Sequence, residues 1–364
     1  CENWQRLFRE KYGAEIPVKD DSRDPAYKKY TMFKSECSKT QKRNLHKTIR
    51  DISPEIAIDG VDYVRIESGT EIGYKTWIYS ASSNARKIIG PDRRRPVDGA
   101  VVDFLGFRYR DTSSSPAQME LRQWQNLANS GSTSLYIMGR LDNHKDVSCY
   151  EGTRKVFQFH KEHEELYMGV ASGAEVVLLH KNLLARYDEE TYGWIRALTE
   201  SHVPFDELKQ ANFENLEQLA GKKIIILSDA KMLNGVQAEL LDKFAEEGGT
   251  VVATGESGLY GKGFVPQEAL SLKCMGVKRI LEKRTKQMSS VFLVNDGEKG
   301  VFSHCAKAPY IPFGEELLMA EFEEGTQKYL SLIPEHPFGP PERCYYTEVT
   351  EHPGVTVHSY GKGR

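Results

Sequence analysis

The sequence predicts an α/β protein with two successive regions of parallel sheet. Apolar, β-branched runs alternate with helix-like segments along most of the chain, which is typical of parallel sheets. In the first region, each run ends in polar residues, as strands do at the catalytic face of a (β/α) barrel. The composition changes near Ala171, where fully apolar strands begin and an open, doubly wound sheet is predicted.

Length and charge set the broad class of the protein. The 364 residues suffice for two or more domains, and a formal net charge of −3 provides no strong field for polyanions. We therefore expect no nucleic acid or membrane partner. No run of about 18 apolar residues occurs, which excludes a predicted membrane span.

The cysteine pattern indicates the compartment and the absence of a metal motif. Six scattered cysteines form no CxxC pair, which argues against a zinc ribbon or a dithiol redox site. We expect no metal and no cofactor. Because so low a cysteine density is typical of a reducing compartment, we expect a cytoplasmic protein.

The chain opens with two predicted helices. Residues 1–13 place aromatic residues at helical spacing before a glycine, and residues 25–50 carry a second apolar stripe among many basic residues. The basic residues indicate a solvated face and not a nucleic-acid stripe. Pro54–Ile58 is predicted to be a short strand. An amphipathic helix at residue 1 and a turn sequence at residues 361–364 lead us to expect a fragment of a longer protein.

The stretch from Asp62 to Glu71 is the most suggestive part of the first region. Its β-branched and aromatic residues predict a strand, and Ser68-Gly69-Thr70 ends it, so Glu67 is placed where a strand meets a loop. In parallel α/β proteins ligands bind at that position. The alternative is that Glu67 is a solvated loop residue.

The same pattern recurs along the first region. Further strands are predicted at residues 100–110 and 135–139, and helices at 77–89, 117–129 and 156–167. In the helix at 117–129, Leu121, Trp124, Gln125 and Ala128 are predicted to lie on one face. The adjacent polar groups are candidate ligands for sugar hydroxyls, although surface ion pairs explain them equally well; they are Arg65, Glu71, Asp103, Arg108, Arg110, Asp142 and His144, with Tyr109 or Trp77 for stacking.

The second region predicts an open doubly wound sheet followed by an extension. Strands are expected at 175–180, 223–227 and 250–254, helices at 191–199 and 237–246, and a turn at 202–206. The segment Gly276–Arg284 is predicted to be helical, residues 290–294 a strand, and the remainder a Pro- and Gly-rich tail. We expect domains at residues 1–170, 171–285 and 286–364.

Nucleophilic catalysis is not expected in the second region. Gly255-Glu-Ser-Gly258 resembles a nucleophile elbow, but the motif requires glycine where this chain has Leu259. No cysteine of the amidotransferase type stands there. Ordinary turn chemistry explains the glycines.

Four strings together resemble glycoside hydrolases related to bacterial β-galactosidases that carry a trimerisation domain. They are CENWQRLFREKYG, YVRIESGTE, LRQWQNLANSGSTSLYIMGRLDN and LLDKFAEEGGTVVATGES, and the likeness extends over roughly residues 1–276. The resemblance implies the C-terminal half of a (β/α)8 barrel followed by a flavodoxin-like, class I amidotransferase-like domain that lacks the amidotransferase nucleophile. It also implies a homo-oligomer.

The resemblance further implies where the catalytic carboxylates belong. The general acid/base of the related galactosidases sits on the fourth barrel strand, just before the residue where this chain begins. Glu67 is then the candidate for the surviving catalytic carboxylate, with Glu71 and Asp103 as substitutes. The galactosidases carry their nucleophile one strand later, where this chain has Phe107-Arg-Tyr-Arg110 and no glutamate.

Two functions therefore remain open. The leading hypothesis is a carbohydrate-active glycoside hydrolase whose site is incomplete in this chain. The alternative is a non-catalytic half-barrel and flavodoxin-like protein used for binding or oligomerisation. A third possibility, an amidotransferase-like enzyme, is disfavoured by the missing cysteine.

Overall fold

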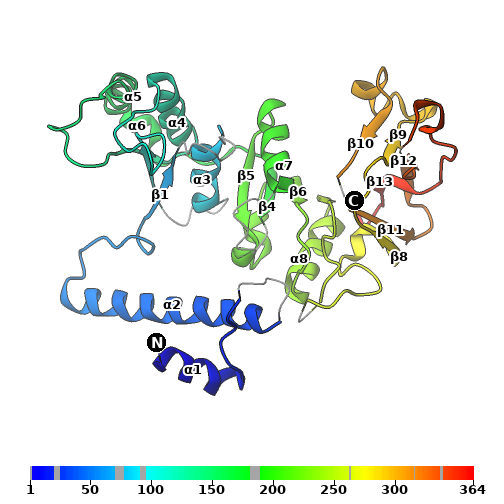
Figure 1. The fold of residues 1–364 in the computed structure, drawn as a ribbon, viewed down its shortest axis with the longest axis horizontal. Helices are drawn as coiled ribbons and strands as arrows, with labels where there is room; N and C mark the ends of the chain where they lie inside the picture. The colour runs from blue at the N-terminus through cyan, green and yellow to red at the C-terminus, as the bar shows by residue number, and fades with distance from the viewer. Residues whose placement is uncertain are drawn as a thin grey trace. The chain divides into compact units, whose positions relative to one another are not determined.

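A computed structural model describes residues 2–19, 25–69, 78–90, 96–180, 189–261, 264–314, 316–336 and 339–364. The chain forms two compact units, Cys1–Val64 and Arg65–Arg364 (Figure 1). No helix within these described ranges is both long and apolar enough to cross a membrane.

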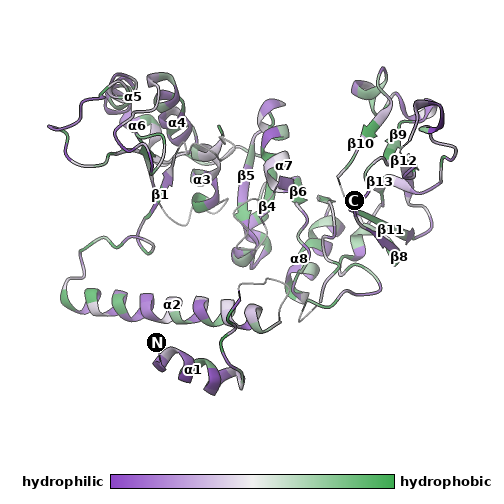
Figure 2. Cartoon of the chain, in the orientation of Figure 1, coloured by the Kyte–Doolittle hydropathy of each residue, from purple (hydrophilic) through white to green (hydrophobic). Residues whose placement is uncertain are grey.

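The first unit consists of two helices held by aromatic side chains. Helix α1 spans Glu2–Tyr12 and α2 spans Pro25–Ile52, as predicted. Phe8 is fully buried, and its ring meets Phe33 edge-on at a centroid distance of 5.4 Å. Apolar and polar bands alternate along α2 (Figure 2). The contact of its apolar stripe with α2 stabilises α1, whose 11 residues are too few for a stable isolated helix.

The predicted strand at Pro54–Ile58 is wrong, because this segment forms turns after α2. The Arg50 guanidinium donates hydrogen bonds of 2.6 Å to the carbonyl oxygens of both Pro54 and Ile56. Backbone acceptors that a strand would offer to a neighbouring strand are therefore used to fold the chain back onto the end of the helix.

The second unit begins with a three-stranded sheet in the order β1-β2-β3. Its strands are β1 (Val64–Ser68), β2 (Val97–Val102) and β3 (Ser132–Tyr136), and β2 and β3 are parallel. Helices follow each strand, as predicted, at α3 (Ser80–Ile89), α4 (Pro116–Ala128), α5 (Tyr150–Glu162) and α6 (Glu164–Tyr167).

A four-stranded parallel sheet follows, in the order β5-β4-β6-β7. It comprises β4 (Val176–His180), β5 (Phe205–Lys209), β6 (Ile224–Leu227) and β7 (Thr250–Ala253), with α7 (Glu189–Glu200) and α8 (Gly235–Glu246) between strands. All five residues of β4 are buried, which explains its uninterrupted apolar sequence. The predicted turn at 202–206 is wrong at its end, where β5 begins.

The C-terminal part is antiparallel. Strand β8 (Val277–Arg284) pairs with β11 (Leu317–Phe322), and a second sheet has the order β10-β9-β12-β13. The latter strands are β9 (Val291–Leu293), β10 (Tyr310–Pro312), β12 (Gln327–Ile333) and β13 (Pro353–Val357).

The predicted helix at Gly276–Arg284 is wrong, because most of it is β8. Met319 pairs with Glu282, whereas the next residue, Ala320, pairs with Ile280, so β8 contains a bulge. An extra residue interrupts the two-residue alternation of a strand. The partly buried side chains of β8 therefore recur at three- and four-residue intervals, which is the spacing that indicates a helix.

A buried carboxylate joins α3 to the four-stranded sheet. Glu207 on β5 is fully buried and accepts hydrogen bonds from Ser83 Oγ and Arg86 Nε, each at 2.9 Å. It also bonds to Nε2 of His180 on β4. Burial alone raises the pKa of Glu207, but the attraction of His180 and Arg86 outweighs it and holds this pKa well below its usual range.

We predict that Glu207→Gln destabilises the chain by about 3–5 kcal/mol, because it leaves buried cationic groups without their counter-charge. The folded-state pKa of Glu207 is below its unfolded value of about 4.3, so its contribution is present above that pH. The difference between wild type and variant should shrink as pH falls below that value. Denaturant unfolding at several pH values measures it.

Glu175→Gln is the matched control, because Glu175 forms an exposed ion pair with Lys223. Its expected effect on the unfolding free energy is at most about 1 kcal/mol. Equal stabilities of the two variants would contradict a central role for Glu207.

Candidate active site

The first sheet presents two different faces. The parallel register pairs Ala100 with Ser134 and Val102 with Tyr136 on one face, and Val101 with Leu135 on the other. Val101 and Leu135 pack against α4 and α5 residues in a small buried core. The face of Ala100 and Val102 is therefore opposite the face covered by these helices, as the interior of a barrel is.

Glu67 lies on the face opposite the helices, near the carboxyl end of β1. Two residues before it, Arg65 Nε lies 3.2 Å from the Asp98 carboxylate, and Arg65 also donates to Ser134 Oγ at 3.1 Å. Two residues after it, Gly69 approaches Val102. Because alternate residues of a strand share a face, the Glu67 side chain lies on the same face as Arg65 and Gly69. Its side chain is exposed.

The backbone of Glu67 is fixed by a helix residue. Asn84 on α3 donates its side-chain amide to the Glu67 carbonyl at 3.0 Å. Arg122 on α4 donates to the carbonyl of Ser68 at 2.8 Å. Side chains thus hold two adjacent backbone carbonyls at the end of β1. These bonds fix the backbone that carries Glu67 and do not involve its carboxylate.

Aromatic side chains line the ends of β2 and β3. The ring of Phe104 lies 6.2 Å from that of Tyr136 and 5.9 Å from that of Phe107. Phe104 is buried, whereas Phe107 and Tyr109 are exposed. Flat apolar rings at the ends of sheet strands suit a ligand that has an apolar face and hydroxyl groups on its edge.

Asp103 lies on the other face, and it is buried. Its backbone pairs with Ser114, and its Oδ1 has no hydrogen-bond partner among the described residues. Burial raises the pKa of Asp103, opposed by the attraction of His144 and Arg122. Asp103 is therefore a buried carboxyl group near Arg122 of α4, and its part in substrate binding stays a prediction.

His144 belongs to the same helix-side cluster. It is partly buried, and its Nε2 lacks a hydrogen-bond partner within the described ranges. The attraction of His144 is one of the effects that lower the pKa of Asp103, against the larger effect of burial.

The remaining predicted substrate residues are on the surface. Arg108 is exposed, and Arg110 donates to the Phe107 carbonyl at 3.1 Å with its guanidinium beside the Phe107 ring. Asp142 forms an exposed ion pair with Arg140. Glu71 and Trp77 lie outside the described residues.

Sequence reasoning did not single out Arg122, which is buried on α4. Leu121 is 45% exposed, and the buried side chains of α4 include Arg122, Gln123 and Asn126. These donate to backbone or hydroxyl oxygens of the strands and loops. The signal was available, since three long polar side chains recur at helical spacing, but polar residues are ordinarily read as solvated. Burial lowers the pKa of Arg122 to about 10.

The GESG turn has a structural role. Ser257 Oγ accepts from the Ala230 amide at 2.9 Å and donates to the Thr254 carbonyl at 2.7 Å. Glu256 is buried and pairs with both Lys231 and Lys283. These contacts tie β8 to the carboxyl edge of the four-stranded sheet and leave the serine hydroxyl fully engaged. No cluster of metal-ligand residues occurs in the described part of the chain.

Comparison with solved structures identifies the fold. A β-galactosidase from Bacillus circulans sp. alkalophilus matches with a TM-score of 0.76 and 14% identity, over 100% of this chain and 63% of the other. A catalytic mutant of Gan42B, a GH42 β-galactosidase from G. stearothermophilus, matches with a TM-score of 0.72 and 15% identity, over 100% and 61%. An α-L-fucosidase from Paenibacillus thiaminolyticus matches with a TM-score of 0.58 and 17% identity, over 80% and 44%.

These matches confirm the resemblance to β-galactosidase-related glycoside hydrolases at the level of fold. The chain spans somewhat under two thirds of the length of the two galactosidase structures. No family model and no curated protein sequence matches it.

We predict that Asp103→Asn stabilises the protein at neutral pH. Because the folded-state pKa of Asp103 is raised, its charged form disfavours folding, and that cost grows as pH rises from about 3.9 through the folded pKa. The stability difference between variant and wild type should therefore increase over this range. Thermal unfolding between pH 4 and 8 measures it, and a variant less stable at neutral pH would contradict the assignment.

Proposed function

We propose that the chain is part of a carbohydrate-active glycoside hydrolase and that Glu67 is a carboxylate of its sugar site. The observation that carries the proposal is the position of Glu67: an exposed carboxylate near the carboxyl end of β1, on the face away from the helices, in a sheet whose other two strands are parallel. The carboxyl ends of parallel strands are where barrel enzymes bind substrates. The match to β-galactosidase and fucosidase folds supports the same class.

We further infer the architecture from strand order. The β1-β2-β3 sheet with its helices would form the C-terminal half of a (β/α)8 barrel. The order β5-β4-β6-β7 corresponds to second, first, third and fourth in the chain, which is how a flavodoxin-like sheet is arranged. Domains at 1–170, 171–285 and 286–364, a homo-oligomer, and a cytoplasmic location are part of this proposal.

The chemistry requires two carboxylates. Retaining glycosidases place them about 5–5.5 Å apart and inverting ones about 6.5–9.5 Å apart. On the face away from the helices, Glu67 supplies one, and Arg65 beside it is paired with Asp98. The second carboxylate would come from barrel strands other than β1, β2 and β3. Catalysis therefore depends on barrel strands beyond this chain, and Phe107 with Tyr109 would supply rings for the sugar face.

We predict that Glu67→Gln lowers turnover of aryl β-galactosides or α-fucosides by at least about 100-fold in a protein that contains the complete barrel. The glutamine keeps the shape but removes the carboxylate charge. Release of nitrophenol measures turnover.

Glu165→Gln, an exposed change on α6, serves as control and should leave turnover unchanged. If Glu67→Gln is folded and retains wild-type turnover, Glu67 is not a catalytic carboxylate. If neither glycoside is cleaved by the wild-type protein, the proposed activity itself is contradicted.

A further inference from the structure

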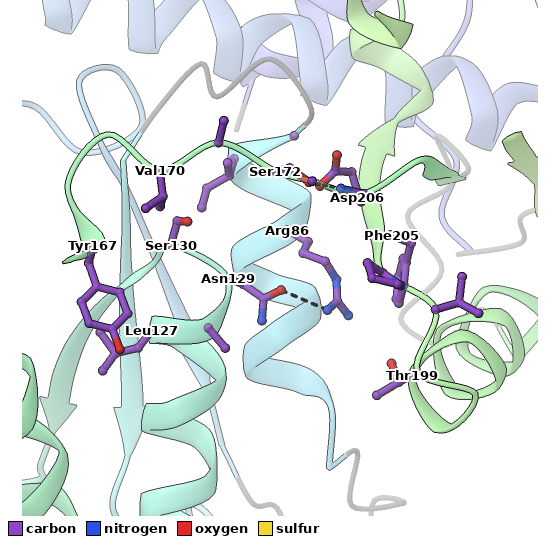
Figure 3. Close-up of a pocket in the computed structure, with 18 of the residues that line it drawn as sticks. Arg86, Leu127, Asn129, Ser130, Tyr167, Val170, Ser172, Thr199, Phe205 and Asp206 are labelled. Atoms are coloured by element: carbon purple, nitrogen blue, oxygen red, sulfur yellow. Dashed lines mark hydrogen bonds between the residues drawn. The ribbon is translucent and has the colours of Figure 1, made fainter. Parts of the chain in front are cut away.

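A second concave site lies away from Glu67, between the helix ends of the first sheet region and the amino-terminal ends of β4 and β5. The pocket has a volume of about 760 Å³. Small-molecule sites typically measure about 300–1,000 Å³. Its walls include Asn129, Tyr167, Thr199 and Phe205 (Figure 3).

Arg86 is the central polar group of this pocket. Its Nε donates to Glu207 at 2.9 Å and its Nη1 to Asn129 Oδ1 at 3.1 Å, while the guanidinium lies 4.1 Å from the centroid of the Phe205 ring. Figure 3 shows the side chain extending between Asn129 and Phe205. Three different contacts thus hold the guanidinium in one orientation.

Two polar atoms of the pocket lining are buried without a hydrogen-bond partner in the described part of the chain. They are Nη2 of Arg86 and Oγ1 of Thr199. An unsatisfied buried donor is costly, and for a charged group the cost is higher than for a neutral one. Nη2 is covered by its neighbours, so a ligand oxygen that accepts from it would first slightly displace the side chains that cover it, and would then satisfy it.

The charges around Arg86 are compatible with an anion. The Glu207 carboxylate offsets one positive charge near the pocket. Arg86, Lys87 and the hydrogen-bonded His180 all attract this carboxylate. The carboxylate on the pocket wall, Asp206, is already paired with Lys222 at 2.5 Å. The balance of charge near Arg86 is therefore positive or neutral.

We propose that this pocket binds a small organic molecule through a carboxylate or phosphate group held by Arg86 Nη2, with Thr199 providing a second hydrogen bond. Arg86 suits this role because a preset guanidinium recognises planar or tetrahedral oxyanions well. The pocket lies at the opposite end of the strands from Glu67, so occupancy is independent of the proposed glycosidase activity.

Calorimetric titration of the full chain with glucuronate, glucose 6-phosphate and glucose tests the proposal. The three probes share one ring and differ in the group at its end. We expect at least one anionic probe to bind and glucose to bind at least about tenfold more weakly. Preference between the two anions tells whether the site takes a carboxylate or a phosphate.

Variants locate the binding. Arg86→Gln should weaken the anion by about 10- to 100-fold, and Thr199→Val, which removes one hydroxyl at almost constant volume, by about three- to tenfold. Arg279→Gln removes an exposed guanidinium on β8 and should change nothing. Glu67→Gln should also bind normally, which separates this site from the proposed function.

Three results would overturn the proposal. They are no heat from either anion at concentrations on the order of 10 mM, equal binding of glucose, or unchanged affinity in Thr199→Val together with folded Arg86→Gln. Circular dichroism reports whether Arg86→Gln is folded. If it is not, Thr199→Val alone decides.

Discussion

Side-chain alternation in the β1-β2-β3 sheet is the constraint on which the candidate site depends. A strand residue points either toward the helices or away from them, and the parallel register fixes the choice for neighbouring strands together. Val101 and Leu135 are directed to the helices, so Val102 and Tyr136 are not. Glu67 alternates with Arg65 and Gly69 and therefore lies with them on the face away from the helices. Asp103, one residue beyond Val102, is on the helix side and is buried.

Polar anchors between the layers maintain this arrangement. Arg122 joins the end of β1 to α4, and Asn126 donates to the Gly99 carbonyl at 2.8 Å. Glu207 performs the same task between α3 and the four-stranded sheet. Buried polar groups are costly unless paired, so each of these contacts favours one packing arrangement over others. The exposed carboxylate of Glu67 is positioned by backbone contacts from Asn84 and Arg122, which themselves are held by helices.

The sequence predicts most helices and the strands β1, β4, β6 and β7 well, because their signals are local, whereas β5 begins inside a predicted turn and the strand predicted at 100–110 ends at Val102. Helix α2 and strand β4 are recognised from apolar spacing alone. The position of Glu67 at a strand end is likewise confirmed. Features that depend on distant partners are not predictable in this way. The bulge in β8 is set by pairing with β11, and the buried polar face of α4 is set by carbonyls of β1 and β2.

Placement of the other candidate residues also depends on contacts across the sheet. Asp103 and Glu67 both follow apolar strands in the sequence, and only the register separates their environments. The pocket at Arg86 could not be inferred from local pattern, since its lining comes from helix ends and strand starts far apart in the chain.

The most direct test of the account is a crystal structure of the protein with galactose. The account predicts that the sugar lies at the carboxyl ends of β1, β2 and β3, with a Glu67 carboxylate oxygen within about 3.2 Å of a sugar hydroxyl and an aromatic ring against its apolar face. A sugar bound elsewhere, or a Glu67 side chain directed toward the helices and away from the sugar, would contradict it.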